Sequence, residues 1–180
     1  MSFSTDWFEL SAKGNFEKFL QKYKGLPNLN FLEIGVYEGM ATVWLLENIL
    51  TDKTSKITTI DTFTKNPDGL YERFIDNIEP YKDKISVIKG ESQTELRHID
   101  EEFDFIYIDG SHFAKDVLED AVLSFRLLKT GGIMIFDDYD WNYYPDQHKN
   151  PKLGIDAFLQ VFEQQFRVLH KSYQVVIEKT

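Results

Sequence analysis

Acidic side chains recur in this sequence where short apolar runs end, and one histidine lies close to them. The acids are Glu33 in Phe31-Leu-Glu-Ile34, Asp61 after Ile57-Thr-Thr-Ile60, Asp109 after Phe105-Ile-Tyr-Ile108, and Asp137 and Asp138 after Ile133-Met-Ile-Phe136. His112 follows Asp109 closely. Carboxylates can accept hydrogen bonds from sugar hydroxyls, pair with a cationic ligand or bind hard divalent ions, and histidine exchanges protons near neutral pH. These residue types predict a site that binds a polar ligand and moves a proton.

The first of these acids belongs to the motif Glu33-x-Gly35-x-x-x-Gly39, between an apolar strand and a helix predicted over residues 40–50. Gly35 allows backbone angles and a close ligand approach that a side chain would prevent, Tyr37 lies in the turn, and Gly39 lets the helix start pack tightly on the strand. Dinucleotide-binding turns usually carry Gly-x-Gly-x-x-Gly for contact with a pyrophosphate. Here the central glycine is missing, and Glu33 would repel a pyrophosphate but can hold an ammonium group. The motif favours S-adenosylmethionine, which has an ammonium group and no phosphate, while a merely tight connection is the alternative.

The next two strand ends supply candidates for contacts with a nucleoside. Asp61 follows Gly39 by about the interval at which βαβ nucleotide sites place an acid against a ribose, and Thr62 is next to it. An ordinary turn cap is the alternative for Asp61. The segment Gly90-Glu-Ser-Gln93 follows a third strand, so Glu91, Ser92 or Gln93 can touch an adenine edge. Ser92 also begins a match to a helix capping box, which is a purely structural role.

The apolar periodicity predicts the elements that position these residues. Strands are predicted over residues 31–34, 56–61, 84–89, 103–109 and 133–136, helices over 40–50, 70–78, 113–128 and 153–166, a turn over 66–69, and a hairpin over 167–179. Strands that alternate with helices indicate a parallel sheet with helices on both faces. We therefore predict one α/β domain over residues 1–180, with a Rossmann-like, doubly wound and mostly parallel seven-stranded sheet that ends in a C-terminal antiparallel hairpin.

Residues 1–27 precede the predicted sheet core of residues 28–180 and are expected to form a helical cap. Phe16, Phe19, Leu20 and Tyr23 follow one another at helical spacing. Because aromatic stripes of this kind usually pack against a core, a cap on the sheet edge is favoured over a lid on the substrate.

The composition restricts the class of protein. The chain has 180 residues, of which 42% are hydrophobic, and this suits a single domain with a sizeable core. It contains no cysteine, which excludes disulfides, zinc–thiolate sites and a cysteine nucleophile. A formal net charge of -10 argues against nucleic-acid partners, because phosphate binding depends on Lys and Arg. Neither a signal peptide nor a membrane-spanning run is recognisable, so we expect a cytoplasmic protein.

Taken together, the strand ends resemble those of class I S-adenosylmethionine-dependent methyltransferases. Ile108-Asp-Gly-Ser-His112 and Leu128-Lys-Thr-Gly-Gly-Ile-Met-Ile-Phe-Asp-Asp138 are similar to the methyltransferase-24 family. That family is related to macrocin O-methyltransferases and, more distantly, to catechol O-methyltransferase. The resemblance covers about residues 28–138.

This resemblance implies a role for each candidate residue. S-adenosylmethionine is expected to contact Glu33, Gly35, Tyr37, Gly39, Asp61, Thr62, Gly90, Glu91, Ser92, Gln93 and Asp109. Asp109, Asp137 and Asp138 fall on the three magnesium ligands of the catechol enzyme, and His112 falls on its catalytic lysine. We therefore expect Mg²⁺ at the three acids and assign His112 and Asp109 as catalytic residues. Loop capping by Asp137-Asp138 and substrate positioning by His112 are the alternatives.

The expected activity is O-methylation of a small-molecule or sugar hydroxyl from S-adenosylmethionine, with assistance from a divalent metal ion. Trp141, Tyr143 and Tyr144 lie in a polar–aromatic loop over residues 139–150 and suggest stacking on a ring or a sugar face. Two alternatives stay open: a nicotinamide-dependent oxidoreductase, against which the missing glycine argues, and a non-catalytic S-adenosylmethionine-binding module. We expect a small-molecule acceptor, no nucleic-acid or membrane partner, and a homodimer of the kind common in the family.

Overall fold

The computed structural model describes residues 1–64 and 69–180, so the predicted turn over 66–69 lies mostly outside the described residues. The described residues form one seven-stranded sheet with the strand order β3-β2-β1-β4-β5-β7-β6. Its strands are β1 (Asn30–Ile34), β2 (Lys56–Asp61), β3 (Ile85–Lys89), β4 (Phe103–Ile108), β5 (Leu128–Phe136), β6 (Phe166–Lys171) and β7 (Val175–Lys179). The pairs from β3 to β5 are parallel, whereas β7 is antiparallel to both β5 and β6. The predicted fold class is confirmed.

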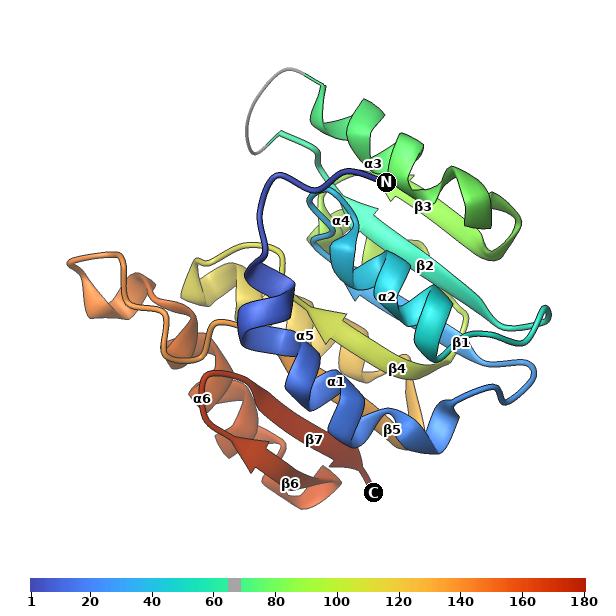
Figure 1. Cartoon of the computed structure of the whole chain (residues 1–180). Coiled ribbons are helices and arrows are strands. Elements are labelled where there is room, and N and C mark those ends of the chain that lie inside the picture. The colour runs from blue at the N-terminus through green and yellow to red at the C-terminus, as the bar shows by residue number, and fades with distance from the viewer. Residues whose placement is uncertain (65–68) are drawn as a thin grey trace.

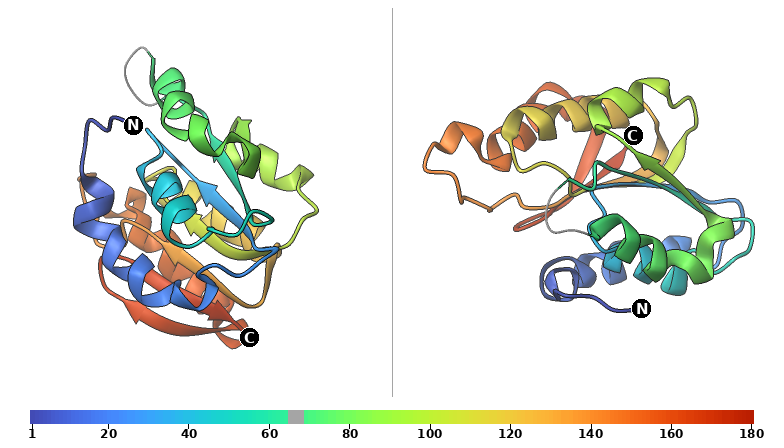
Figure 2. Two further views of the ribbon diagram at one scale, coloured as in Figure 1. Left: turned by 45° about the vertical axis from the view of Figure 1, so that its right-hand side comes forward. Right: turned by 90° about the horizontal axis from the view of Figure 1, so that it is seen from above.

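Helices cover both faces of this sheet, which gives the molecule three layers (Figures 1 and 2). α1 (Lys13–Phe19), α2 (Met40–Asn48) and α3 (Leu70–Ile78) lie on one face, and α5 (Ala114–Phe125) and α6 (Pro151–Val161) lie on the other. Shorter helical turns are η1 (Phe8–Ala12), η2 (Gln21–Tyr23), η3 (Glu79–Lys84), α4 (Ser92–Glu95), η4 (Leu96–His98), η5 (Gln147–Lys149) and η6 (Glu163–Gln165). In the described part of the chain, no helix is both long enough and apolar enough to span a membrane.

The central strands explain why both faces need helices. Almost every residue of β1 and β4 is buried, so their side chains enter a core on each side of the sheet. On one side the ring of Phe16 packs against those of Phe105 and Tyr107, with centroids 5.7 and 4.9 Å apart. On the other side Ile106 belongs to the core that contains Val117 of α5. The N-terminal helices therefore pack on a face of the sheet, and the expected cap on its edge is wrong.

Two predicted boundaries are also wrong. β5 begins at Leu128, so Gly131 and Gly132 lie inside the strand, and α5 has already ended at Phe125. α6 ends at Val161, and Phe166 begins β6 instead of closing the helix. In both places an apolar residue at helical spacing continues the helical pattern, although a neighbouring strand can bury the same side chain equally well.

The strand order places the predicted site residues at one edge. β1 lies between β2 and β4. The chain passes outward from β1 through β2 to β3 and then returns to β4 on the other side of β1, and such a reversal of strand order is the usual ligand site of open α/β sheets. The parallel strands end at the same edge, where they carry or precede Glu33, Asp61, Gly90, Asp109 and Asp137.

Candidate active site

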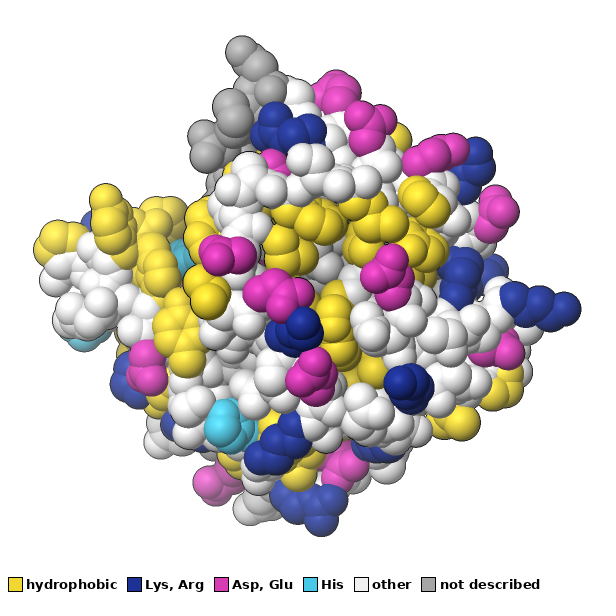
Figure 3. Space-filling view, viewed as in Figure 1, with side chains coloured by type: hydrophobic (Ala, Val, Ile, Leu, Met, Phe, Trp, Pro, Cys, Tyr) yellow, Lys and Arg dark blue, Asp and Glu magenta, His cyan; other side chains and the backbone are white. Residues whose placement is uncertain are grey.

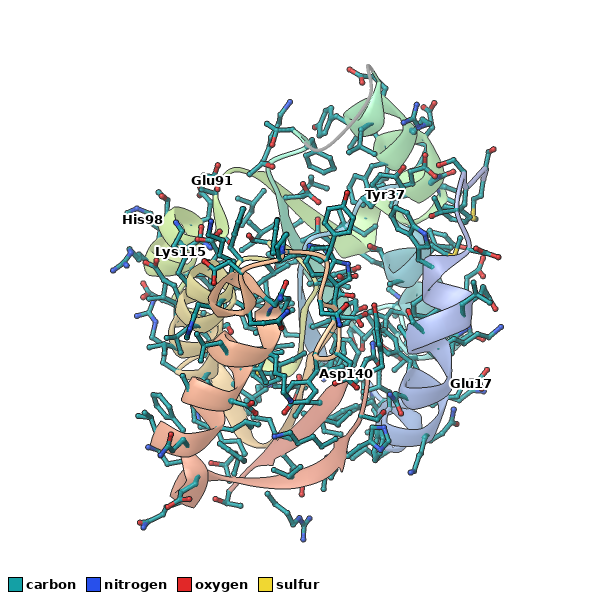
Figure 4. All side chains as sticks on the ribbon, turned by 90° about the vertical axis from the view of Figure 1, so that its left-hand side faces the viewer. Glu17, Tyr37, Glu91, His98, Lys115 and Asp140 are labelled. Carbon is teal, nitrogen blue, oxygen red and sulfur yellow. The ribbon has the colours of Figure 1, made fainter. Side chains whose placement is uncertain are left out.

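A cavity of about 890 Å³ opens at this edge and extends from the turn after β1 to the loop after β5. With the exception of Gly39, every site residue predicted from the sequence is among those that line it. In Figure 4, which looks onto this edge, Tyr37 and Glu91 lie on opposite sides and Asp140 lies on the loop after β5. The structure thus brings the predicted nucleoside contacts and the predicted catalytic residues into one cavity.

The two glycines of the first turn are required by their neighbours in the protein. Both have left-handed φ angles, 82° at Gly35 and 86° at Gly39. A Cβ on Gly35 would lie 2.1 Å from the carbonyl oxygen of Asp109, and one on Gly39 would lie 2.9 Å from the ring of Phe74. Gly35 therefore allows the β1 turn to approach the end of β4. Gly39 packs the start of α2 against α3, not against the strand as predicted.

Glu33 lines the cavity although it is only 1% exposed. Burial raises the pKa of Glu33 to about 8, the charge of Asp61 acts in the same direction, and the hydrogen bond from Thr42 opposes them. That bond runs from the Thr42 hydroxyl to Oε2 of Glu33 at 2.7 Å. A cation next to this carboxyl would stabilise its ionised form, so Glu33 is suited to an ammonium group. Thr42, which lies in the first turn of α2, was not among the predicted site residues.

Asp61 closes the same turn from β2. Its Oδ2 accepts hydrogen bonds from the N–H groups of Val36 (2.8 Å) and Tyr37 (3.2 Å), and its Oδ1 accepts one from the N–H of Phe63 (2.7 Å). Asp61 therefore does cap the turn, which is the structural role considered for it as an alternative. A carboxylate offers about four acceptor positions, so Asp61 can also accept hydrogen bonds from ribose hydroxyls in the cavity. Thr62 lines the cavity next to it.

The segment after β3 forms the outer wall of the cavity through Gly90, Glu91, Ser92 and Gln93. The predicted capping box is wrong, because Glu91 is the N-cap of α4 and its side chain makes no capping hydrogen bond. Ser92 is already inside the helix. The amide of Gln93 is instead held from α5, since its Nε2 donates to Oδ1 of Asp120 at 3.0 Å.

The ends of β4 and β5 carry a buried polar cluster. The Tyr107 hydroxyl lies 3.1 Å from Oδ2 of Asp109 and also donates to Oδ2 of Asp137, which accepts a 2.9 Å hydrogen bond from Nε2 of Gln174. Burial, with the charge of Asp137, raises the pKa of Asp109 well above its usual range. Burial and the charge of Asp138 likewise raise the pKa of Asp137. Tyr107 lies two residues before Asp109 and on the same strand face, a signal that could have identified it.

His112 reaches this cluster from the loop after β4. Its Nε2 lies 2.7 Å from Oδ2 of Asp138, whose Oδ1 accepts a 2.7 Å hydrogen bond from the Tyr173 hydroxyl. The Trp141 ring packs on the imidazole with centroids 4.7 Å apart. Asp138 has a φ of 58°, an uncommon conformation for a residue other than glycine and one that recurs at functional sites. An acid in this position can stabilise the imidazolium form of His112.

The three acids predicted as magnesium ligands are only partly arranged for that purpose. Carboxylate oxygens are the donors that Mg²⁺ prefers. However, Asp137 is engaged by Tyr107 and Asp138 by His112. Across residues 1–64 and 69–180, no group of three His, Cys, Asp or Glu side chains is placed to hold a metal ion. As arranged here, the side chains do not fit a three-carboxylate metal site.

Aromatic side chains surround the opening of the cavity. Trp7 of the N-terminal segment (61% exposed) and Trp141 of the loop after β5 both line it. Phe113 lines it too, and its ring stacks on that of Tyr144 at 4.7 Å. In Figure 3, hydrophobic side chains gather where the segment 139–150 projects from the molecule. The N-terminal segment is therefore both a cover of the sheet and part of the cavity wall.

A doubly wound sheet with an acid-lined cavity at its switch point defines a Rossmann-like domain for a nucleoside-containing ligand. Residues 32–139 match the sequence model of the methyltransferase-24 family, which is described as a methyltransferase domain. The chain belongs to this family of class I S-adenosylmethionine-dependent methyltransferases. This membership decides against the nicotinamide-dependent alternative.

Individual methyltransferases are also similar to this chain, although their sequence identities are low. A candidate cobalt-precorrin-6B C(15)-methyltransferase (decarboxylating) from Sulfurisphaera tokodaii is 28% identical over 119 residues, which cover 66% of this chain and 57% of that protein. The chain thus spans little more than half the length of this curated relative. A candidate rRNA methylase from Clostridium thermocellum has a TM-score of 0.74 at 17% identity, covering 94% of this chain and 98% of that one. The MycE methyltransferase of the mycinamycin biosynthetic pathway, solved with Mg, SAH and mycinamycin VI, has a TM-score of 0.68 at 18% identity, covering 99% and 50%.

Proposed function

We propose that this protein transfers the methyl group of S-adenosylmethionine to a hydroxyl oxygen of a small molecule or sugar. One observation carries the proposal: a single cavity is lined by Glu33 and Asp61 at one end and by His112, with Asp138 next to its Nε2, at the other. Methyl transfer needs both ends within reach, because the acceptor oxygen must attack in line with the bond that breaks.

At the cofactor end, the polar groups of the chain match those of S-adenosylmethionine. Glu33 pairs with the ammonium group, which removes the cost of ionising a buried carboxyl. Asp61 accepts hydrogen bonds from the ribose, and Gln93 borders the base. When bound, S-adenosylmethionine supplies an electrophilic methyl group on a sulfonium.

At the acceptor end, His112 takes the proton from the attacking hydroxyl. Asp138 lies 2.7 Å from its Nε2 and stabilises the imidazolium that forms. Trp7 and Trp141 offer flat faces on which a ring or a sugar can stack. Mycinamycin VI in the MycE complex is in keeping with a small-molecule acceptor. The Clostridium thermocellum protein suggests RNA instead, which the net charge of -10 disfavours here.

Magnesium assistance is a separate proposal. It is supported by the oxygen donors of Asp109, Asp137 and Asp138 and by the Mg in the MycE complex. The route through His112 does not depend on it, because the described side chains do not fit such a site as arranged. A homodimer and a cytoplasmic location remain predictions.

The test is an incubation with S-adenosylmethionine carrying a radiolabelled methyl group and separate pools of catechols, sugars, macrolide glycosides and RNA. We expect label in a hydroxyl pool and equal release of S-adenosylhomocysteine. His112→Gln should lose this activity, whereas His148→Gln, an exposed histidine nearby, should keep it. Label only in RNA would overturn the acceptor class. Cofactor binding without transfer to any pool would support the non-catalytic binding module instead.

A further inference from the structure

A buried carboxylate on α5 holds a side chain at the outer wall of the cavity. Asp120 is 1% exposed, and its Oδ1 accepts the hydrogen bond from Nε2 of Gln93 at 3.0 Å. α4, which carries Gln93, packs against α5. In Figure 4, Glu91 and Lys115 mark this corner, where the segment after β3 meets the start of α5. Asp120 is not itself among the lining residues, so it acts on the cavity through lining residues that it contacts, of which Gln93 is one.

Burial of the Asp120 carboxyl costs folding free energy, so stability alone does not explain its position. The Ser92 side chain interacts with this carboxyl and opposes the pKa rise caused by burial. Among the described residues, Oδ2 of Asp120 is nevertheless the one buried side-chain polar atom without a hydrogen bond of good geometry. Burying a carboxylate without satisfying all of its acceptors costs free energy. Unsatisfied buried groups of this kind often mark a functional constraint.

The hydrogen bond to Asp120 decides which atom of the Gln93 amide is available to a ligand. Burial raises the pKa of Asp120 to about 7, so the calorimetry below is done at about pH 8.5, where the side chain is a carboxylate. A carboxylate only accepts hydrogen bonds, so Gln93 directs its NH₂ group toward Asp120. The carbonyl oxygen Oε1 is then the amide atom that can accept a hydrogen bond in the cavity. An amide without this partner could present either its oxygen or its nitrogen.

The sheet order indicates which part of the ligand lies there. Asp61, the proposed ribose contact, ends β2, and β3 is the next strand outward from β1. A nucleoside with its ribose at Asp61 extends its base toward the end of β3, where Gln93 lines the cavity. Adenine presents an exocyclic amino group, which is a donor, whereas hypoxanthine presents a carbonyl oxygen at the same place.

We propose that Asp120 is a positioning residue that makes the cavity selective for adenine, because it orients the Gln93 amide so that Oε1 accepts a hydrogen bond from the adenine amino group. The inference rests on the proposed function, since it requires an adenosyl ligand in this cavity. A 6-oxo base would place its carbonyl oxygen against Oε1, and two acceptors repel each other.

The experiment compares the affinities of S-adenosylhomocysteine and S-inosylhomocysteine by calorimetry. Wild type should prefer the adenosyl ligand by about 10-fold to 100-fold, the range expected for one hydrogen bond at a buried site. In Asp120→Asn the new amide can donate or accept, so Gln93 can present either atom, and the ratio should fall to within about threefold of one. Glu119→Gln is the control. It removes the same charge from the exposed side of α5, where Glu119 pairs with Arg97 at 2.7 Å, and should keep the wild-type ratio.

A double-mutant cycle with Gln93 tests whether Asp120 acts by positioning this side chain or only by stabilising the fold. Gln93→Met removes the amide, so adding Asp120→Asn to it should leave the ligand ratio unchanged. Wild-type selectivity in Asp120→Asn, or the same change of ratio in the Gln93→Met background, would overturn the inference while the proposed function stands. No binding of S-adenosylhomocysteine to wild type would overturn both. Thermal unfolding checks each variant, and Asp120→Ser replaces Asp120→Asn if the latter does not fold.

Discussion

Replacing Glu33 with glutamine should stabilise the fold and weaken cofactor binding at the same time. Burial raises the pKa of Glu33 from an ordinary 4.5 to about 8, so the folded state binds this proton more tightly than the unfolded state does. The stability of the wild type therefore falls as pH rises between these two values. At 1.36 kcal/mol per pKa unit, the loss approaches roughly 4 kcal/mol at pH 8, as an upper limit. Glutamine carries no charge and can still accept the hydrogen bond from Thr42, so it should avoid most of this loss.

Urea unfolding at pH 5 and pH 8 measures the effect. Glu33→Gln should unfold with a higher free energy than wild type at pH 8, and the two should converge toward pH 5. Glu38→Gln is the matched control: burial alone would raise the pKa of Glu38, but hydrogen bonds from Ser4 and the ion pair with Arg73 hold it below its usual range. This control should lose stability at pH 8. A Glu33→Gln variant less stable than wild type at pH 8 would refute the electrostatic reasoning, and an unchanged affinity for S-adenosylhomocysteine would refute the ammonium contact.

Three further predictions concern the two ends of the cavity. Asp61→Asn should weaken the binding of S-adenosylhomocysteine by about 1–3 kcal/mol in calorimetry, because it loses acceptors for the ribose; equal affinity would remove Asp61 from the site. His112→Ala should lower turnover by about 10²–10⁴ with little change in cofactor affinity. Asp138→Asn added to it should lower turnover little further, since the two act as a pair. If Mg²⁺ assists, EDTA should abolish transfer and leave cofactor binding intact, whereas full activity in EDTA would contradict the magnesium proposal.

The sheet could be predicted from the sequence because its central strands carry a local signal. Phe31-Leu-Glu-Ile34 and Phe103 to Ile108 are apolar except for one acid each, Glu33 and Asp104, as is typical of strands covered on both faces. The same logic placed acids at the ends of four of the predicted strands, and all five acids (Glu33, Asp61, Asp109, Asp137 and Asp138) line one cavity. The helix ends were harder to predict, because Phe166 fits a helical pattern and a strand equally well.

The partners of the site residues could not be predicted, since they come from segments distant in the sequence. Asp137 and Asp138 were expected to share a metal ion, yet Gln174 and Tyr173 in the C-terminal hairpin region supply hydrogen bonds to them. Gly39 was expected to pack on the strand, but its neighbour is Phe74, a residue of another helix. Sequence spacing identifies which groups reach the edge of the sheet, while their contacts depend on the packing of separate elements.

Titration of the wild-type protein with S-adenosylhomocysteine, and in parallel with NAD⁺, tests the central claim that the cavity holds S-adenosylmethionine between Glu33 and Asp61. We predict saturable one-to-one binding of S-adenosylhomocysteine, no comparable heat with NAD⁺, and weakened binding in Glu33→Gln but not in Glu47→Gln, which changes an exposed acid on α2. Binding of NAD⁺ in place of S-adenosylhomocysteine, or equal affinity of wild type and Glu33→Gln, would contradict the claim.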